Sequence, residues 1–151
     1  MKNFKIFLTL LLLSSFGLTA QNKATSTADK YFARYEFNDA IEAYEKLIEK
    51  GKADDYVYTQ LAKANQQIFN TVESERWYAK VVKSSQNPEM IYQYSQMLKA
   101  NGKYEESNAQ MKKFAGFRPA DERSVAFNKN PDYLPKILEK GKKFNVQNLS
   151  I

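Results

Sequence analysis

The clearest pattern of apolar and polar positions in the chain runs through residues Glu36–Ile48. Its apolar residues recur with the spacing of an α-helical turn, at Phe37, Ala40, Ile41, Tyr44, Leu47 and Ile48. This spacing predicts an amphipathic helix that buries one face. Asn38 is suited to cap the start of the helix, and Gly51 is suited to end it. A single helix of this length is not stable in water, so the pattern also predicts partner helices.

The same pattern returns further along the chain, at intervals of 34 and then 33 residues. Three positions carry a small, a large and a medium side chain in turn: Ala40, Tyr44 and Leu47, then Ser74, Tyr78 and Val81, then Ser107, Met111 and Phe114. A period near 34 with these sizes resembles the tetratricopeptide repeat family, in which each repeat is a pair of helices. The resemblance implies an all-α solenoid of about three helix pairs.

Cap and turn residues suggest where each repeat begins and ends. Asp54 or Asp55 can cap the second repeat, and Gly102 provides the turn between the two helices of the third. Asn65 stands where the family usually has a tyrosine. We expect a first helix at 27–34, a second repeat at 54–85, and a third from Asn87-Pro88 to Pro119.

After Pro119 the period stops, and two shorter helical patterns follow at 120–127 and 131–140. We expect these to form a helical cap, with Val125 and Phe127 covering the open end of the last repeat. Residues 144–151 alternate strictly between apolar and polar, which is a strand pattern. That tail would be an edge strand for another chain or the start of a following β domain.

The first twenty residues read as a signal peptide rather than as part of the fold. Lys2 and Lys5 precede a short apolar run, and small residues then lead to Ala20. The alternative is a transmembrane anchor, but the apolar run is short for a span and no charged stop follows it. We therefore expect this organisation: 1–20 signal peptide, 21–119 repeats, 120–140 helical cap, and 141–151 linker or strand.

Composition limits the chemistry that the chain can perform. Histidine and cysteine are both absent, which removes imidazole bases, thiolate nucleophiles, disulfides and a lipid anchor on cysteine. The acidic pairs Asp54-Asp55 and Asp121-Glu122 fall at expected helix starts, where acids complement the helix dipole. There is no glycine-rich phosphate loop. We expect no enzyme activity, no cofactor and no metal.

The formal net charge of +6 is modest, and it falls to +4 without the two lysines of the expected signal peptide. No basic tract, zinc-ligand spacing or glycine-aromatic motif points to nucleic acid. Such a charge indicates only a weak general attraction to anionic partners.

In a solenoid of helix pairs the first helix of each pair lines the concave side. A mixture of aromatic, amide and lysine side chains there could hold a peptide with a carboxylate; the alternative is an ordinary hydrated surface. The residues expected on this face are Phe32, Tyr56, Lys63, Gln66, Tyr92, Gln96 and Lys99.

A narrower resemblance rests on the signal ending Thr-Ala-Gln, on the run from Ala28 to Ile48, and on the run from Tyr133 to Ile151. These stretches are similar to the amino-terminal module of Bacteroidota OmpA-family envelope proteins. In that family helical repeats precede a β-propeller and a peptidoglycan-binding domain, and PorE-like members belong to the type IX secretion and gliding machinery. The chain departs from lipoprotein members by having Gln21 in place of cysteine, and its 151 residues do not include the stretch that would form the peptidoglycan-binding domain.

This resemblance implies a periplasmic scaffold, associated with the outer membrane through other domains or partners, that binds a protein or peptide of the cell envelope. The alternative is a structural packing module, or a small free periplasmic adaptor, without a separate ligand. The oligomeric state does not follow from the sequence.

Overall fold

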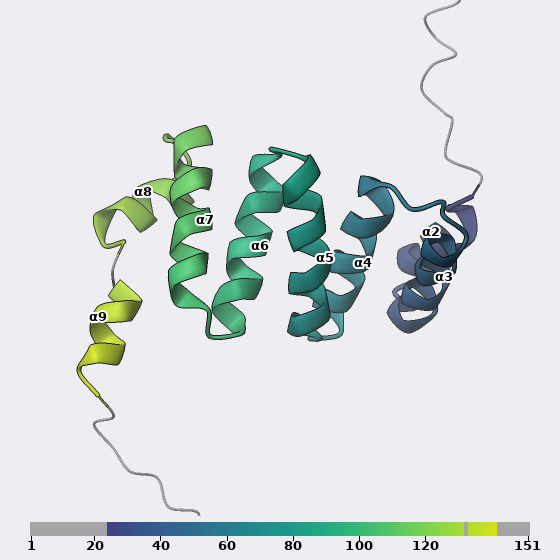
Figure 1. Ribbon diagram of the computed structural model, residues 1–151, viewed down its shortest axis with the longest axis horizontal. Helices are drawn as coiled ribbons and strands as arrows, with labels where there is room; N and C mark the ends of the chain where they lie inside the picture. Colours follow the sequence, from purple (N-terminus) through teal and green to yellow (C-terminus); the bar gives the residue numbers. More distant parts are fainter. Residues whose placement is uncertain (1–23, 132, 142–151) are drawn as a thin grey trace, which may run out of the picture. The chain divides into compact units, whose positions relative to one another are not determined.

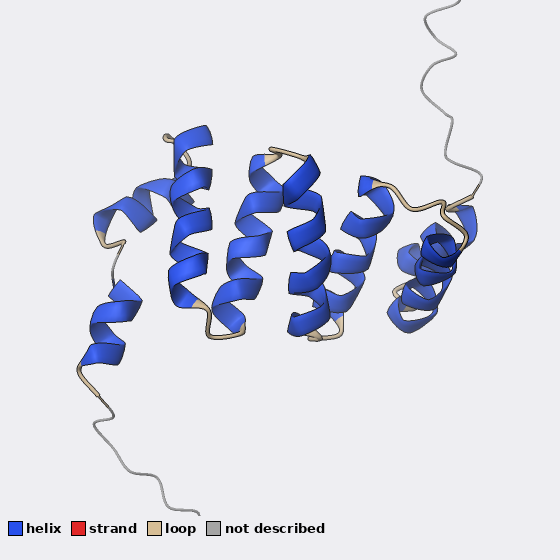
Figure 2. Cartoon of the chain, in the orientation of Figure 1, coloured by secondary structure: helices blue, strands red, loops and turns tan. Residues whose placement is uncertain are grey.

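A computed structural model describes residues 24–131 and 133–141, and this part of the chain is helical (Figure 2). It divides into two compact units, one up to Lys52 and one from Ala53. The first contains α2 (Ser26–Ala33) and α3 (Phe37–Glu49). The second contains α4 (Asp55–Gln67), α5 (Thr71–Ser84), α6 (Pro88–Ala100), α7 (Tyr104–Phe117), α8 (Glu122–Lys129) and α9 (Tyr133–Glu139).

The first unit is a pair of helices that pack together through small residues and one buried tyrosine. Ala28 of α2 and Ala40 of α3 are buried, which lets the two helices approach closely. Tyr44 is also fully buried, and its hydroxyl donates a hydrogen bond to Asp29 Oδ1 at 2.6 Å. The predicted amphipathic helix is therefore confirmed as α3, with its apolar face against α2.

The prediction that Asn38 caps this helix is wrong. The helix already begins at Phe37, so Asn38 lies inside it, and Glu36 at the N-cap makes no capping hydrogen bond. The reason lies in the preceding turn, where Tyr35 has φ +63° and the Glu36 amide donates to the Tyr31 carbonyl at 3.0 Å. This tight turn reverses the chain before Asn38 is reached.

The predicted end of α3 is confirmed. Gly51 has φ +65°, a left-handed conformation that costs glycine little. The Lys52 amide donates to the Leu47 carbonyl at 2.8 Å, and the Gly51 amide donates to the Ile48 carbonyl at 2.9 Å. These two bonds satisfy carbonyls that the end of a helix otherwise leaves open.

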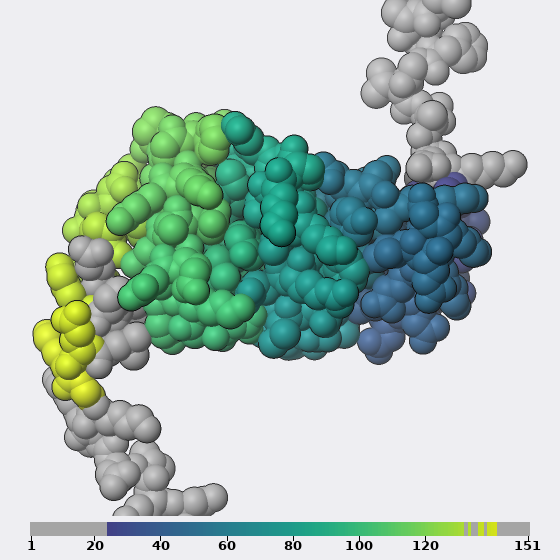
Figure 3. Space-filling view, viewed as in Figure 1, coloured from purple at the N-terminus to yellow at the C-terminus, as the bar shows by residue number. Residues whose placement is uncertain are grey.

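In the second unit, α4, α5, α6 and α7 lie side by side in chain order, and α8 and α9 pack against α7 (Figure 1). Side chains fill the space between these neighbouring helices in the space-filling view (Figure 3). The small, large and medium positions form the buried seam of each pair, as predicted: Ser74, Tyr78, Val81, Ser107, Met111 and Phe114 are all buried.

The small position of each pair in this unit is a serine whose hydroxyl also has a buried partner. Ser74 Oγ donates to the Ala62 carbonyl, and Ser107 Oγ donates to the Ser95 carbonyl, both at 2.8 Å. Each bond joins the second helix of a pair to the first. Serine therefore supplies close approach together with a satisfied polar group.

A polar cluster joins the second helix pair to the third. Asn101, just after α6, accepts a hydrogen bond from the Thr71 hydroxyl at 2.6 Å and donates to Glu75 at 2.8 Å. Lys103 Nζ lies 2.7 Å from the same Glu75 carboxylate. The turn of one repeat is thus fixed to the second helix of the repeat before it.

The acidic pairs stand at helix starts, as the sequence predicts. Asp54 is the N-cap of α4 and accepts a hydrogen bond from the Val57 amide at 3.0 Å. Asp121 is the N-cap of α8 and accepts one from the Arg123 amide at 2.9 Å. Asn87, just before Pro88, caps α6 in the same way through the Glu89 amide.

The last two helices differ in detail from the prediction. They cover 122–129 and 133–139 rather than 120–127 and 131–140. Phe127 is half-buried and packs on the cluster of Ile91, Met111 and Phe114, as expected, whereas Val125 is 44% exposed and is not among the residues packed on that cluster. Helix geometry explains this difference, because side chains two positions apart on a helix point to nearly opposite sides.

The expected signal peptide at 1–20 and the strand-like tail at 144–151 lie outside the described residues. Within 24–131 and 133–141, no helix has the length and apolar character needed to cross a membrane.

Candidate interaction site

Three of the seven predicted site residues line one cavity of about 350 Å³. Tyr92, Gln96 and Lys99 reach it from α6, where their spacing places them on one helix face. The opposite wall comes from α8 and the turn after it. We call this space the α6–α8 cavity, lined by Tyr92, Gln96, Lys99, Ser107, Asn108, Met111, Arg123, Ala126, Phe127, Asn130, Pro131 and Tyr133.

The wall opposite α6 is held in place by a hydrogen bond from the repeats. Asn108 Nδ2 of α7 donates to the Pro131 carbonyl at 3.0 Å. This bond ties the turn between α8 and α9 to the last repeat helix. Asn130 and Pro131 therefore form a fixed edge of the cavity.

Arg123 connects α8 to α6 through charge and through aromatic stacking. Its Nη1 donates to both carboxylate oxygens of Glu89, at 2.9 and 3.2 Å, and its Nη2 donates to Asp121 at 2.9 Å. Its guanidinium carbon lies 4.3 Å from the centre of the Tyr92 ring and 4.7 Å from that of Phe114. Planar stacking together with a forked donor set is specific to arginine.

These contacts favour the charged forms of Arg123 and Asp121 and shift their pKa values accordingly. The hydrogen bonds from the Arg123 side chain and backbone lower the pKa of Asp121 to about 2. The hydrogen bonds to Asp121 and Glu89 raise the pKa of Arg123. The positive charge of Arg123 is thus balanced by two carboxylates and is not available to a ligand.

Lys99 provides the free positive charge at the cavity. It is exposed, and it forms no ion pair with any residue in the described part of the chain. Gln96, Asn108 and Asn130 add amide groups, while Tyr92 and Tyr133 add aromatic surface. This combination suits binding of a polar peptide by stacking, hydrogen bonds and one ion pair.

The other four predicted residues do not join this cavity. Phe32 belongs to the first unit, where its ring packs edge-on against Phe37 with centroids 5.4 Å apart. On α4, Tyr56 is 46% exposed and its hydroxyl accepts a hydrogen bond from Gln60 at 3.0 Å, while Lys63 is half-buried. That they take part in binding stays a prediction.

Gln66 has a structural partner on each side. Its Oε1 accepts a hydrogen bond from the Tyr78 hydroxyl at 3.0 Å, and its Nε2 donates to Gln93 Oε1 at 3.3 Å. Burial, with a smaller contribution from Glu89, raises the pKa of Tyr78 to about 12, so this hydroxyl keeps its proton. Gln66 therefore links α4 to α5 and α6.

Sequence reasoning missed Arg123, Asn108 and Asn130. Arg123 and Asn130 lie beyond the last repeat, where the period gives no guide to which side chains face α6. Asn108 lies in a repeat, but its partner is a backbone carbonyl outside it. The one available signal was that Arg123 follows the acidic pair Asp121-Glu122. An arginine at that position can donate hydrogen bonds to the carboxylate that caps its own helix.

No family model and no curated protein matches this chain. Solved structures do match its fold. The chain is similar to MamA AMB-1, with 16% identity, a TM-score of 0.63, and coverage of 80% of this chain and 73% of that one. It is similar to the first TPR of Spaghetti (RPAP3) bound to HSP90 peptide SRMEEVD, with 16% identity, a TM-score of 0.60, and coverage of 82% and 98%.

The first TPR domain of human RPAP3 is similar as well, with 15% identity, a TM-score of 0.62, and coverage of 79% of this chain and 94% of that one. A TPR-containing domain of a Plasmodium falciparum putative FK506-binding protein aligns at a TM-score of 0.59 with 16% identity. These similarities agree with the period near 34 residues and with the buried seam of each helix pair. The chain has the fold of a tetratricopeptide repeat domain.

Proposed function

We propose that this chain is a non-catalytic protein-interaction module whose α6–α8 cavity holds a peptide segment rich in carboxylates. One observation carries the proposal: Tyr92, Gln96 and Lys99 of a single α6 face meet a wall supplied by α8 in one cavity. No residue that lines this cavity in the described part of the chain is acidic. An acidic segment would meet Lys99 without a competing carboxylate on the lining.

Peptide binding by the same fold supports this proposal. The Spaghetti (RPAP3) domain was solved with the HSP90 peptide SRMEEVD, which contains acidic residues. At 16% identity that similarity concerns the fold alone, so the proposed ligand class rests on the cavity of this chain. The partner would be bound and released chemically unchanged.

We also propose that the chain works outside the cytoplasm, in the periplasm, as part of an assembly associated with the outer membrane. Support comes from Lys2 and Lys5, the apolar run after them and the small residues up to Ala20. The resemblance to OmpA-family envelope modules further suggests a role linked to type IX secretion or gliding.

A second candidate function is structural packing against a following domain or another subunit. Exposed apolar side chains at the carboxyl-terminal end of the described chain favour it, since Tyr133 is 55% and Ile137 is 44% exposed. In that case α9 would be covered by protein, and the cavity would have no ligand of its own.

A peptide selection tests the first candidate. The processed chain is immobilised, peptides with free carboxyl termini are selected on it, and fluorescence anisotropy gives the affinity of the selected peptides. We expect selection of acidic peptides, and we expect Lys99→Glu to weaken their binding by about fivefold, the effect of about 1 kcal/mol from one exposed charge. Lys112→Glu is the matched control, because Lys112 is exposed on α7 and lines neither this cavity nor the larger one described below.

Two results would count against this site. Selected peptides could show no acidic preference, or Lys99→Glu and Lys112→Glu could weaken binding equally, which would indicate general electrostatic attraction. If no peptide is selected while Tyr133→Ser and Ile137→Ser change association with a downstream domain, structural packing is the better account.

A further inference from the structure

A second and larger cavity lies on another side of α6, away from the α6–α8 cavity. Its volume is about 480 Å³, which is within the range of ligand sites in proteins. We call it the α5–α7 groove, lined by Ala79, Val82, Lys83, Ser85, Gln86, Ile91, Tyr94, Gln110, Lys113 and Phe117. The two cavities share no lining residue.

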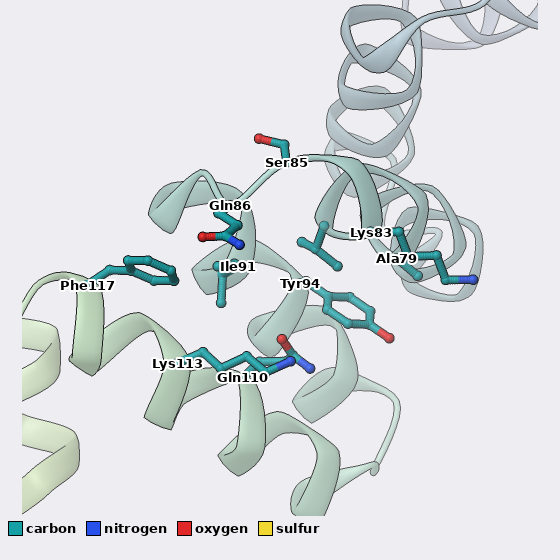
Figure 4. A pocket seen from close by; sticks show the side chains of 10 residues that line it. Ala79, Lys83, Ser85, Gln86, Ile91, Tyr94, Gln110, Lys113 and Phe117 are labelled. Carbon is teal, nitrogen blue, oxygen red and sulfur yellow. The ribbon is translucent and has the colours of Figure 1, made fainter.

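The groove has an apolar floor and helical walls. Ile91 and Tyr94 of α6 lie at its base, and Phe117 of α7 lies toward one end (Figure 4). Val82 of α5 also lines it. In Figure 4 the Phe117 ring points toward Ile91 rather than away from the groove. Phe117 is nevertheless 47% exposed, so a large apolar surface remains in contact with water.

The shape of the groove suits a short helix. The α7 residues that line it lie between Gln110 and Phe117, a stretch that extends about 10 Å along the helix axis, or about two turns. Residues of α5 line the opposite wall at helical spacing. Neighbouring helices with exposed apolar ridges form the kind of groove that receives the apolar face of another amphipathic helix.

The charged side chains that line the α5–α7 groove are all positive. Lys83 and Lys113 are exposed and line it from opposite walls, and no lining residue in the described ranges is acidic. Neither lysine forms an ion pair with any residue that the structure describes. Lys83 lies at one edge, whereas the amine of Lys113 extends toward Gln110 (Figure 4). An occupant with carboxylates beside its apolar face would be complementary to both walls.

We propose that the α5–α7 groove is a second docking site, which takes an amphipathic acidic helix from a partner protein. The apolar face of that helix covers Val82, Ile91 and Phe117, and its flanking carboxylates pair with Lys83 and Lys113. Because it uses other residues, this site stands or falls independently of the α6–α8 cavity. With both sites, one helix pair could hold two segments at once.

The test uses two designed fluorescent peptides of about fifteen residues, the length at which a helix begins to persist in water. Both carry leucines along one face; one has glutamates on the flanks and the other has lysines. Anisotropy measures their binding to the processed chain, and backbone amide NMR shifts show where they bind. We expect the glutamate peptide to bind, with shifts concentrated on 79–86, 91–94 and 110–117, and the lysine peptide to bind at least several-fold more weakly.

Charge variants test the contact itself. Lys83→Glu with Lys113→Glu should weaken the glutamate peptide by about tenfold or more, since two exposed charges are reversed, and should strengthen the lysine peptide. Phe117→Ser should weaken both peptides. Lys112→Glu should leave binding of the glutamate peptide unchanged, because Lys112 is exposed and lines neither cavity. Circular dichroism checks that each variant is folded.

Several results would overturn the proposal. The glutamate peptide could fail to bind at concentrations up to about 1 mM, the weakest affinity of functional interest here. Its shifts could lie on the α6–α8 cavity, or Lys112→Glu could weaken it as much as the double variant does. Equal affinity of the two peptides would also overturn it, since the groove would then select only apolar surface.

Discussion

At the scale of single residues, the two buried serines show how a repeat position can be polar and still form a seam. The sequence predicts a small side chain at Ser74 and Ser107, and the structure confirms it. It adds a hydrogen bond from each hydroxyl to a carbonyl of the paired helix. The hydrogen bonds could not be predicted, because alanine satisfies the same size pattern without making them.

Substitutions at Ser74 separate the contribution of size from that of the hydrogen bond. Ser74→Ala should lower the free energy of unfolding by about 1 kcal/mol, the typical value of one buried hydrogen bond. Ser74→Leu should cost more, up to about 3 kcal/mol, because the extra volume forces α4 and α5 apart. Urea unfolding followed by circular dichroism measures both. Equal effects of the two variants would contradict the requirement for a small residue.

Arg123 and Asp121 make the stability of the start of α8 dependent on pH in the acid range. The pKa of Asp121 is lowered from 3.8 to about 2, chiefly by hydrogen bonds from Arg123. A lowered pKa means that the ionised form stabilises the folded state. This stabilisation is fully present above pH 3.8 and is lost as the pH falls toward 2.

NMR titration of the Asp121 carboxyl group tests this assignment. We expect a midpoint near pH 2 in the parent chain and a higher midpoint in Arg123→Ala, which loses the side-chain hydrogen bonds but keeps the one from the backbone amide of residue 123. Amide hydrogen exchange in α8 should become faster in the same variant. Lys129→Ala is the control, because Lys129 is exposed at the other end of α8 and makes no ion pair in the described part of the chain. A midpoint that Arg123→Ala does not change would show that another group lowers the pKa of Asp121.

At the scale of elements, the turns inside the repeats share one backbone geometry but not one residue type. Tyr35, Phe69 and Gly102 occupy equivalent places in successive repeats, and their φ angles are +63°, +59° and +78°. The sequence suggests this turn for Gly102, where glycine adopts the conformation freely. The sequence does not suggest the same turn for Tyr35 or Phe69, because a residue with a Cβ atom is disfavoured in the left-handed backbone conformation.

Exchanging glycine into or out of this turn should change stability in opposite directions. Phe69 is 88% exposed, so Phe69→Gly should relieve the backbone strain and raise the free energy of unfolding by up to about 1 kcal/mol. Gly102→Ala should lower it by about 1 kcal/mol through the backbone alone, since a Cβ atom there meets nothing within 4 Å. Thermal unfolding measures both, with Phe69→Ala as the control that keeps the left-handed strain. Stabilisation by Phe69→Ala equal to that by Phe69→Gly would show that the exposed ring, not φ, is unfavourable.

The helices themselves could be predicted more accurately than their ends. Apolar spacing gave α3 to α7 nearly in full, because packing decides which face is buried. The position at which a helix begins depends on local hydrogen bonds, as the contrast between Asn38, which caps no helix, and Asp121, which caps α8, shows. Asn38 could cap a helix but is preceded by a turn that already closes the chain, whereas Asp121 does cap α8 and moves its start from 120 to 122.

At the scale of the whole molecule, the repeat period predicts the fold class but only one wall of the candidate site. Tyr92, Gln96 and Lys99 share a helix face, so their meeting in one cavity follows from spacing. The other wall comes from α8 and Asn130, which follow the last repeat. The repeat pattern does not predict how a helix after the last repeat packs against it. The α5–α7 groove was not predicted either, because its lining combines residues of α5, α6 and α7 with Ser85 and Gln86 of the connection between α5 and α6.

The expected signal peptide gives a prediction about the mature chain. Expressed in a Gram-negative bacterium, the protein should reach the periplasm and have an intact mass that begins at Gln21, because small residues precede the expected cleavage after Ala20. Ala20→Arg should block cleavage and leave the longer form at the membrane. Recovery of the full-length chain from the cytosol would contradict both export and the proposed periplasmic role.

The hydrogen bonds of Ser74 and Ser107 also affect how such a chain can change in length. Each bond closes within its own helix pair, between residues twelve positions apart. A duplicated or deleted segment of one whole period would therefore include both ends of its serine hydrogen bond. The corresponding bond in the neighbouring helix pair would be unaffected. Gene rearrangement in units of about 34 residues could lengthen or shorten the array, whereas a shorter insertion between the two bonded residues of a pair would separate a hydroxyl from its carbonyl.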